Sequence, residues 1–267
     1  FRTKLSENLF KGLSPWMQKL PGGLIHVNVV GCALFAAISG SSAATVATVG
    51  KMSIPELRKR NYPEKILLGS LAGSGTLGLL IPPSIILIIY GVAVQESIAK
   101  LFIAGIIPGI MIALIFMSYV IIWSLINKKS MPKMIEEYSF FEKIKRSKQL
   151  LPVIILILAV IGSIYTGIAT ATEAASLGVV GALILSYFQK SLTLKTFKSS
   201  LLGATKTSCM IAFILAGSTF LSLAMGFTGL PRNLALWIQN MELSPYVLIF
   251  VLMIFYIILG MFLDGIS

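Results

Sequence analysis

The residues best suited to bind a ligand lie in one uncharged stretch, and they are Gly73, Gly75, Thr76, Gly78, Pro82, Pro83 and Ser84. Glycine has no side chain to stiffen the backbone, and two adjacent prolines lack the N–H groups that would continue a helix. This combination predicts a helix that is broken in the middle. Carbonyl groups at the end of its first half would attract a cation, and N–H groups at the start of its second half would attract an anion.

The sequence around these residues indicates that the break lies inside a membrane. Residues 66–95 carry no charge, and ~20 apolar residues are enough to cross the ~30 Å hydrocarbon layer of a bilayer. In hydrocarbon, open backbone is tolerated only where protein or a water-filled cavity covers it. We therefore expect residues 66–95 to form a broken transmembrane helix whose free backbone groups hold a ligand.

A second group of small polar residues divides the preceding apolar run, and its members are Ser39, Gly40, Ser41 and Ser42. Each half of the run 24–50 would reach only about half of the bilayer at ~1.5 Å per residue. One interpretation is a re-entrant hairpin with Ser39–Ser42 at its tip. The other is a complete span whose small residues form a helix-packing face.

The distribution of basic residues bears on this choice. If 24–50 is a hairpin, 20 of the 22 Lys and Arg residues fall on one side of the membrane, in segments 1–20, 51–65, 128–148 and 190–206. If it is a complete span, the best division is 16 to 6. Because basic residues gather on the cytoplasmic side, the hairpin is favoured.

The composition indicates a polytopic membrane protein. The 267 residues are 56% hydrophobic and 12% charged, with a mean hydropathy of +0.90, whereas soluble domains carry about 25% charged residues. The net charge of +12 comes mostly from segments between apolar runs, so it serves membrane orientation and not nucleic-acid binding. His26 is the only histidine, and Cys32 and Cys209 lie apart inside apolar segments. We expect no enzymatic activity and no cofactor.

The chain divides into the following expected segments: an interfacial amphipathic segment (1–23), the hairpin (24–50), a cytoplasmic link (51–65), the broken helix (66–95), a transmembrane helix (101–127), a basic cytoplasmic loop (128–149), two transmembrane helices (150–189), a cytoplasmic connector (190–206), a transmembrane helix (207–227), an interfacial helix (228–242) and a last apolar segment (243–267).

Two acidic residues lie beside apolar runs. Glu173 is a candidate for binding a proton or cation, but Thr170 three residues before it completes the S/T-x-x-E pattern of a helix N-terminal capping box, which is the favoured interpretation. Asp264 follows a long uncharged run. It is either a loop residue beyond a complete span or a buried charge at a helix break.

Four stretches together resemble one family, and they are 35–44 (FAAISGSSAA), 74–84 (SGTLGLLIPPS), 167–175 (GIATATEAA) and 260–264 (GMFLD). They are similar to the large membrane subunit of tripartite ATP-independent periplasmic (TRAP) transporters. Where this chain has Ala171, the family more often has proline, at a position away from the expected ion site. The resemblance extends over nearly the whole chain.

The resemblance implies an all-α polytopic membrane protein, namely an elevator-type secondary transporter with inverted repeats, re-entrant hairpins and a broken transmembrane helix. Residues 243–267 then form the start of a second, truncated re-entrant hairpin. The chain would cover the middle of a longer protein.

The resemblance also assigns roles to residues. Sodium would bind mostly through backbone carbonyls at Ser39, Gly40, Ser41, Ser42, Gly75, Thr76, Gly78 and Pro82. The substrate region would include Ser41, Ser42, Pro83, Ser84 and Asp264, and a second ion region would include Gly260 and Asp264.

The implied function is sodium-driven import of an organic acid, such as a C4-dicarboxylate, across the bacterial inner membrane. A periplasmic binding protein would deliver the carboxylate, and a small membrane (Q) subunit would be the partner within the lipid bilayer. The alternatives are a stand-alone anion/sodium symporter of the same superfamily and, more remotely, a membrane-embedded enzyme or an assembly subunit.

Overall fold

The computed structural model describes residues 5–132, 138–148 and 150–263, and these residues form helices and no strands. The helices are α1 (Leu5–Met17), α2 (Ile25–Ser39), α3 (Ser42–Lys59), α4 (Glu64–Gly75), α5 (Leu77–Leu80), α6 (Ile85–Val94), α7 (Ile98–Ile126), the 3₁₀ helix η1 (Lys128–Ser130), α8 (Phe140–Ser147), α9 (Leu151–Tyr165), α10 (Ala171–Phe188), α11 (Leu194–Thr228), α12 (Leu230–Gln239) and α13 (Pro245–Phe262).

The long apolar helices confirm the prediction of an all-α polytopic membrane protein. Five helical segments among the described residues are long and apolar enough to cross a membrane. They are Glu64–Val94, Ile98–Ile126, Ala171–Phe188, Leu194–Thr228 and Pro245–Phe262. The pair α8 and α9, bent by 56° between them, provides a sixth if it is counted as one span.

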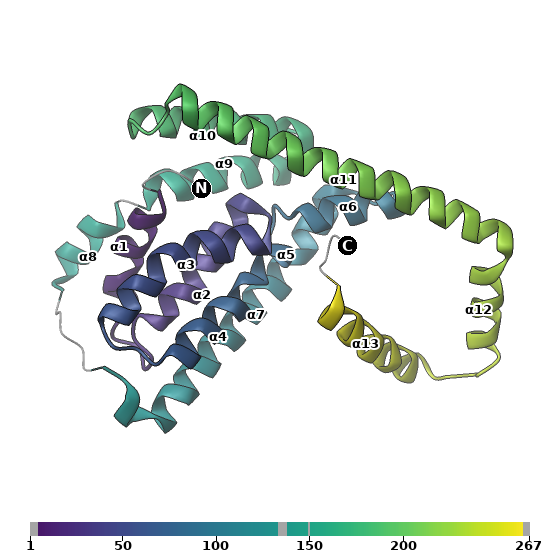
Figure 1. Cartoon of the computed structure of the whole chain (residues 1–267), viewed down its shortest axis with the longest axis horizontal. Helices are drawn as coiled ribbons and strands as arrows, with labels where there is room; N and C mark the ends of the chain where they lie inside the picture. The colour runs from purple at the N-terminus through teal and green to yellow at the C-terminus, as the bar shows by residue number, and fades with distance from the viewer. Residues whose placement is uncertain (1–4, 133–137, 149, 264–267) are drawn as a thin grey trace. The chain divides into compact units, whose positions relative to one another are not determined.

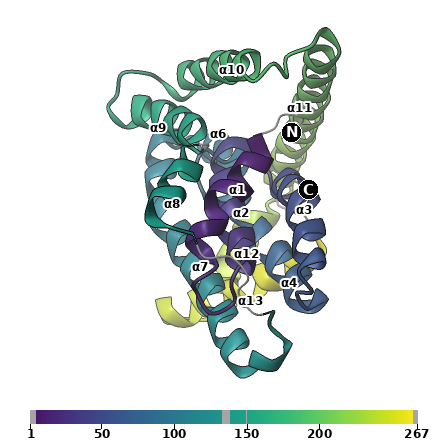
Figure 2. The ribbon, with the colours of Figure 1, turned by 90° about the vertical axis from the view of Figure 1, so that its left-hand side faces the viewer.

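The chain forms two compact units, Phe1–Leu192 and Thr193–Ser267. In the first unit, α2 lies among α1, α3, α4, α5 and α7 (Figures 1 and 2). Its side chains supply much of the core, since Ile25, Val27, Val29 and Cys32 are almost completely buried. A helix that is apolar on all sides requires this kind of enclosure or a lipid environment.

A sharp turn joins α2 to α3. Gly40 ends α2 with a φ of 60°, a left-handed conformation that glycine adopts without a steric penalty. Ser41 then caps α3, because its side chain accepts a hydrogen bond from the Ala44 N–H. The turn brings α2 and α3 side by side, and both pack against α4.

A buried polar link ties α2 to α4. The Asn28 side-chain amide donates to the Leu67 carbonyl at 3.2 Å and to the Ser70 hydroxyl at 3.0 Å. On the next turn the Ser74 hydroxyl donates to the Ser70 carbonyl at 2.5 Å and reaches the Asn28 carbonyl at 3.4 Å. Because buried polar groups are costly without partners, this link fixes the first arm of the broken segment against α2.

α9 and α10 pack against each other as a pair. The turn between them contains Gly167 with a φ of 73°. At the start of α10 the Thr170 hydroxyl accepts from the Glu173 N–H at 3.3 Å, and a Glu173 carboxylate oxygen accepts from the Thr170 N–H at 2.8 Å. The predicted capping box is therefore confirmed.

α1 packs against α8 in the first unit. Trp16 donates from its indole N–H to the Ser147 hydroxyl at 2.7 Å, and the Lys143 ammonium lies 5.5 Å from the centre of the Trp16 ring. An indole with one polar edge suits the boundary between lipid and water.

The second unit consists of α11, α12 and α13. α11 begins at Leu194, within the segment 190–206 that was expected to be a connector, and it continues to Thr228. Thr193 caps this helix together with Thr196, and lysine has a high helix propensity. A polar, basic sequence therefore extends the helix beyond the apolar run.

Candidate ion- and substrate-binding site

The tip of the α2–α3 hairpin lies against the break between α4 and α6. The Ile85 N–H donates to the Gly40 carbonyl at 3.3 Å. A Cβ atom added to Gly40 would lie 3.0 Å from the Pro83 carbonyl oxygen and 3.2 Å from the Ile85 nitrogen. The backbone of the tip therefore contacts the backbone at the start of α6, with no side chain between them.

Hydroxyl groups stiffen the tip. The Ser41 carbonyl accepts from the Thr45 N–H at 3.0 Å, from the Thr45 hydroxyl at 2.7 Å and from the Ser39 hydroxyl at 3.3 Å. The Ser39 and Thr45 hydroxyls are also 2.8 Å apart. Thr45 is completely buried, so it anchors the tip of the hairpin to the first turns of α3.

The break has two parts. Helix α4 ends at Gly75, and the Thr76 hydroxyl donates to the Gly73 carbonyl at 2.7 Å. The short helix α5 then ends at Leu80, ahead of Pro82 and Pro83. The second interruption follows directly from proline chemistry, because proline has no N–H to donate to the carbonyl four residues earlier.

The two prolines leave two carbonyls without their usual helical donors, those of Gly78 and Leu79. The Ser84 hydroxyl replaces one donor, since it donates to the Leu79 carbonyl at 2.6 Å. The Gly78 carbonyl accepts no hydrogen bond from the residues that the structure describes. This backbone oxygen of the break therefore has capacity left for a cation.

Glycine allows the tip and the break to approach closely. A Cβ on Gly78 would lie 2.9 Å from the Ser41 carbonyl carbon, 3.0 Å from its oxygen and 3.0 Å from the Ser42 nitrogen. A Cβ on Gly75 would overlap the Val46 side chain. Since the neighbours of Gly78 are backbone atoms, they cannot rotate away as a side chain can.

Helix α7 supports the opposite side of the break. A Cβ on Gly105 would lie 2.8 Å from the Leu80 carbonyl oxygen, and one on Gly109 would lie 2.9 Å from the Ile81 side chain. The break is thus held between the hairpin tip and a glycine face of α7. Small residues spaced in this way let helix backbones approach each other in membranes.

The groups that meet here are backbone dipoles and hydroxyls. α2 ends at the tip and presents carbonyls, whereas α3 and α6 begin there and present N–H groups. Helix C-termini favour cations and helix N-termini favour anions. In the described part of the chain, no cluster of three or more His, Cys, Asp or Glu residues could hold a metal ion. A hard cation with oxygen ligands fits this chemistry, and a thiolate- or imidazole-bound metal does not.

The structure brings the residues predicted for the first site together, and they are Ser39, Gly40, Ser41, Ser42, Gly75, Thr76, Gly78, Pro82, Pro83 and Ser84. Gly40, Gly75, Gly78, Pro82 and Ser84 are buried, and Thr76 is exposed. Gly260 lies in α13 of the second unit, with no atom within 4 Å of an added Cβ. Asp264 lies outside the described residues.

Sequence reasoning missed three features of this site: the Thr45 anchor, the Asn28 link and the Gly105 contact. The spacing of Gly105 and Gly109, four residues apart on one helix face, was a signal for close backbone packing. The Asn28 link had no local signal, because its partners Leu67 and Ser70 lie far away in the sequence.

The fold defines a multi-pass membrane protein built around a hairpin and an interrupted helix. A family model described as "Tripartite ATP-independent periplasmic transporter, DctM component" matches residues 2–267. The chain therefore belongs to the DctM family, as the four motifs predicted. This is a family of transporter permease subunits of the bacterial inner membrane and not of enzymes.

Curated relatives agree with the family. The chain is 35% identical over 244 residues to the C4-dicarboxylate TRAP transporter large permease protein DctM of Pseudomonas aeruginosa, covering 91% of this chain and 56% of that protein. It is 34% identical to the protein of the same name from Rhodobacter capsulatus, covering 91% and 58%. It is 31% identical to the sialic acid TRAP transporter large permease protein SiaM of Vibrio cholerae, covering 98% and 61%. The chain thus spans between a half and two thirds of the length of these relatives.

Proposed function

We propose that the chain is the central part of the large permease subunit of a sodium-driven importer of organic acids. One observation carries this proposal: the backbone of the hairpin tip lies directly against the break, at Gly78 and Ser41 and through the Ile85–Gly40 hydrogen bond. Two interrupted backbones that face each other supply an ion site without any charged side chain, as in other secondary transporters.

Sodium would bind on the carbonyl side of this contact. The Gly78 carbonyl lacks a hydrogen-bond donor from the described residues, and a Cβ on Gly78 would meet the Ser41 and Ser42 backbone of the tip. The Ser41 carbonyl already accepts three hydrogen bonds, so it is a poorer ligand than the sequence suggested. We expect carbonyls of the break to contribute more to the sodium site than Ser41 does.

The organic anion would bind on the N–H side, near the starts of α3 and α6. The residues available there are Ser41, Ser42, Pro83 and Ser84, and Asp264 stays a predicted member from its sequence motif. Bound sodium would offset the charge of the anion as both cross the bilayer. Each net positive charge moved inward would gain ~2.3 kcal/mol per 100 mV of membrane potential.

The names of the relatives guide the choice of substrate and partners. They include C4-dicarboxylate, sialic acid and isethionate transporters, and the isethionate protein of Oleidesulfovibrio alaskensis is named DctMQ. The three compounds in these names are organic anions. We propose a C4-dicarboxylate as the first substrate to test, a periplasmic binding protein as its donor and a small Q subunit as the membrane partner. We further propose an elevator mechanism in which the hairpin and the break move together.

Uptake by the full-length protein tests this proposal. The permease, its small subunit and its binding protein are reconstituted in proteoliposomes, and import of labelled C4-dicarboxylate, sialic acid and isethionate is followed with and without an inward sodium gradient. We expect import of one of these anions only with both sodium and the binding protein. Undiminished import without a sodium gradient would contradict sodium coupling, and import without the binding protein would favour the stand-alone symporter.

A further inference from the structure

A pocket away from the hairpin site lies between the α1–α2 turn and the end of α7. It has a volume of about 390 Å³, within the ~300–1,000 Å³ range of small-molecule sites. Its lining comes from the α1–α2 turn, the α3–α4 turn and the end of α7, and consists of Gln18, Lys19, Leu20, Pro21, Gly22, Gly23, Tyr62, Ser124, Leu125, Lys128, Met131 and Pro132.

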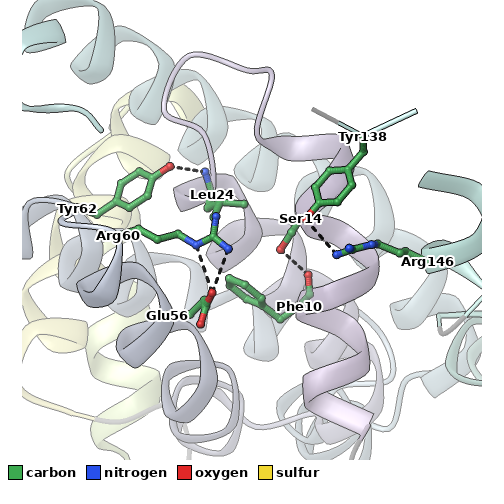
Figure 3. Close-up of polar contacts among 8 residues, drawn as sticks. All are labelled: Phe10, Ser14, Leu24, Glu56, Arg60, Tyr62, Tyr138 and Arg146. Atoms are coloured by element: carbon green, nitrogen blue, oxygen red, sulfur yellow. Dashed lines mark hydrogen bonds and ion pairs between the residues drawn. The ribbon is translucent and has the colours of Figure 1, made fainter. Parts of the chain in front are cut away.

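The charge of this lining is positive. Lys19 and Lys128 contribute ammonium groups from two different elements, and none of the described residues that line the pocket is acidic. The charged groups of the nearby α3–α4 turn pair with each other, since Arg60 donates to the Glu56 carboxylate at 3.1 and 3.2 Å (Figure 3). The pocket therefore has the electrostatic character of an anion site.

Two neutral side chains of the lining also have hydrogen-bonding capacity left. Gln18 lines the pocket and is only 7% exposed, and its side-chain amide has two N–H donors. The Tyr62 hydroxyl accepts from the Leu24 N–H at 3.0 Å, as Figure 3 shows, so its own hydrogen is free to donate. Burial raises the pKa of Tyr62 above its ordinary value, which keeps that hydrogen in place.

The position of the pocket identifies the source of the anion. Leu125 and Lys128 flank the end of the apolar helix α7, and Tyr62 precedes the span that begins at Glu64. The pocket thus lies at a membrane boundary, on the side where most Lys and Arg residues gather. Anionic phospholipids are concentrated in the cytoplasmic leaflet, and basic pockets between helices on that side bind their headgroups.

We propose that this pocket binds the phosphate-containing headgroup of an anionic phospholipid. Lys19 and Lys128 neutralise the phosphate, and Gln18 and Tyr62 donate hydrogen bonds to its oxygens or to the rest of the headgroup. The bound lipid would join the α1–α2 turn to the end of α7. This site is separate from the hairpin site and does not depend on the transported substrate.

Native mass spectrometry of the full-length protein tests the proposal with phosphatidylglycerol as the probe and phosphatidylcholine as the neutral comparison. The double variant Lys19→Gln/Lys128→Gln removes both pocket charges. The matched control Lys65→Gln/Lys129→Gln removes two exposed lysines that do not line the pocket. We expect the pocket variant to bind phosphatidylglycerol about 30-fold more weakly, which corresponds to ~1 kcal/mol per lysine. The control should change by less than about threefold, since its lysines contribute only long-range, screened attraction.

Three outcomes would overturn the proposal. Equal weakening in both double variants would mean that general surface charge attracts the lipid. Equal retention of phosphatidylcholine and phosphatidylglycerol would mean that the site does not select an anion. Displacement of phosphatidylglycerol by millimolar inorganic phosphate would assign the pocket to a soluble phosphate compound instead of a lipid. A Gln18→Leu variant that keeps both lysines should show a smaller, selective loss, which a purely electrostatic surface would not show.

Discussion

The two units of the chain are built on different physical principles. In the first unit, helices pack through buried apolar side chains, buried amide and hydroxyl groups, and glycines that touch backbone atoms. In the second unit, none of the described residues is buried, and no atom lies within 4 Å of a Cβ added at Gly203, Gly217, Gly226 or Gly260. The helices of the second unit therefore depend on their apolar composition and on the surrounding lipid for stability. The helices of the first unit depend on individual contacts, so substitutions there should change the free energy of unfolding much more.

The largest expected effect comes from Gly78→Ala. The added Cβ would meet the Ser41 and Ser42 backbone at 2.9–3.0 Å, and such overpacking costs ~1–3 kcal/mol or more. The matched variant in the second unit is Gly217→Ala in α11, which should be neutral or gain up to ~1 kcal/mol from helix propensity. Denaturation of the purified full-length protein in mixed micelles measures both changes. Equal changes in the free energy of unfolding of the two variants would contradict the claim that individual contacts matter more in the first unit than in the second.

The next effect concerns the buried link between α2 and α4. Asn28→Ala removes the donor to Leu67 and Ser70, and it should lower the free energy of unfolding by ~1–3 kcal/mol because two buried hydrogen bonds of ~0.5–1.5 kcal/mol each are lost. Asn233→Ala, on the exposed α12, should change it by less than ~0.5 kcal/mol. The same denaturation assay applies, and a harmless Asn28→Ala would show that the link adds nothing to the packing of the first arm.

The smallest effect is expected at the second half of the break. Ser84→Ala removes the hydroxyl that donates to the Leu79 carbonyl in place of the missing proline N–H, and one hydrogen bond contributes ~1 kcal/mol. Ser218→Ala in α11 is the control and should be close to neutral. A loss of the same size at Ser218 would indicate that serine hydroxyls stabilise these helices generally, and not the break in particular.

Much of the fold could be predicted because its signals are local. The uncharged runs predict helices that span a membrane, and Thr170 with Glu173 predicts a cap, since each depends on neighbouring residues. The start of α11 at Leu194 is not evident from the sequence, because its polar, lysine-rich residues resemble a connector although lysine favours helices. Hydropathy marks where a helix can enter lipid and not where the helix begins.

The site could be predicted only in part. Gly78, Pro82 and Pro83 indicate a break through their own backbone chemistry, and Ser39–Ser42 indicate a tip. The identity of the groups that face them depends on residues distant in sequence, such as Gly105 against the Leu80 carbonyl. The three hydrogen bonds to the Ser41 carbonyl could not be read from the sequence, and they are the reason why we propose the carbonyls of the break as the main sodium ligands.

The most direct test of the proposed sodium site is the effect of sodium on the thermal stability of the full-length protein. Melting curves are recorded in sodium chloride and in choline chloride of equal ionic strength, for wild type, Gly78→Ala and Gly217→Ala. A ligand that binds only the folded state raises its stability. We therefore expect sodium to raise the melting temperature of wild type and Gly217→Ala, and to have no effect on folded Gly78→Ala. An equal rise in choline, or a sodium effect that survives in Gly78→Ala, would contradict an ion site between the hairpin tip and the break.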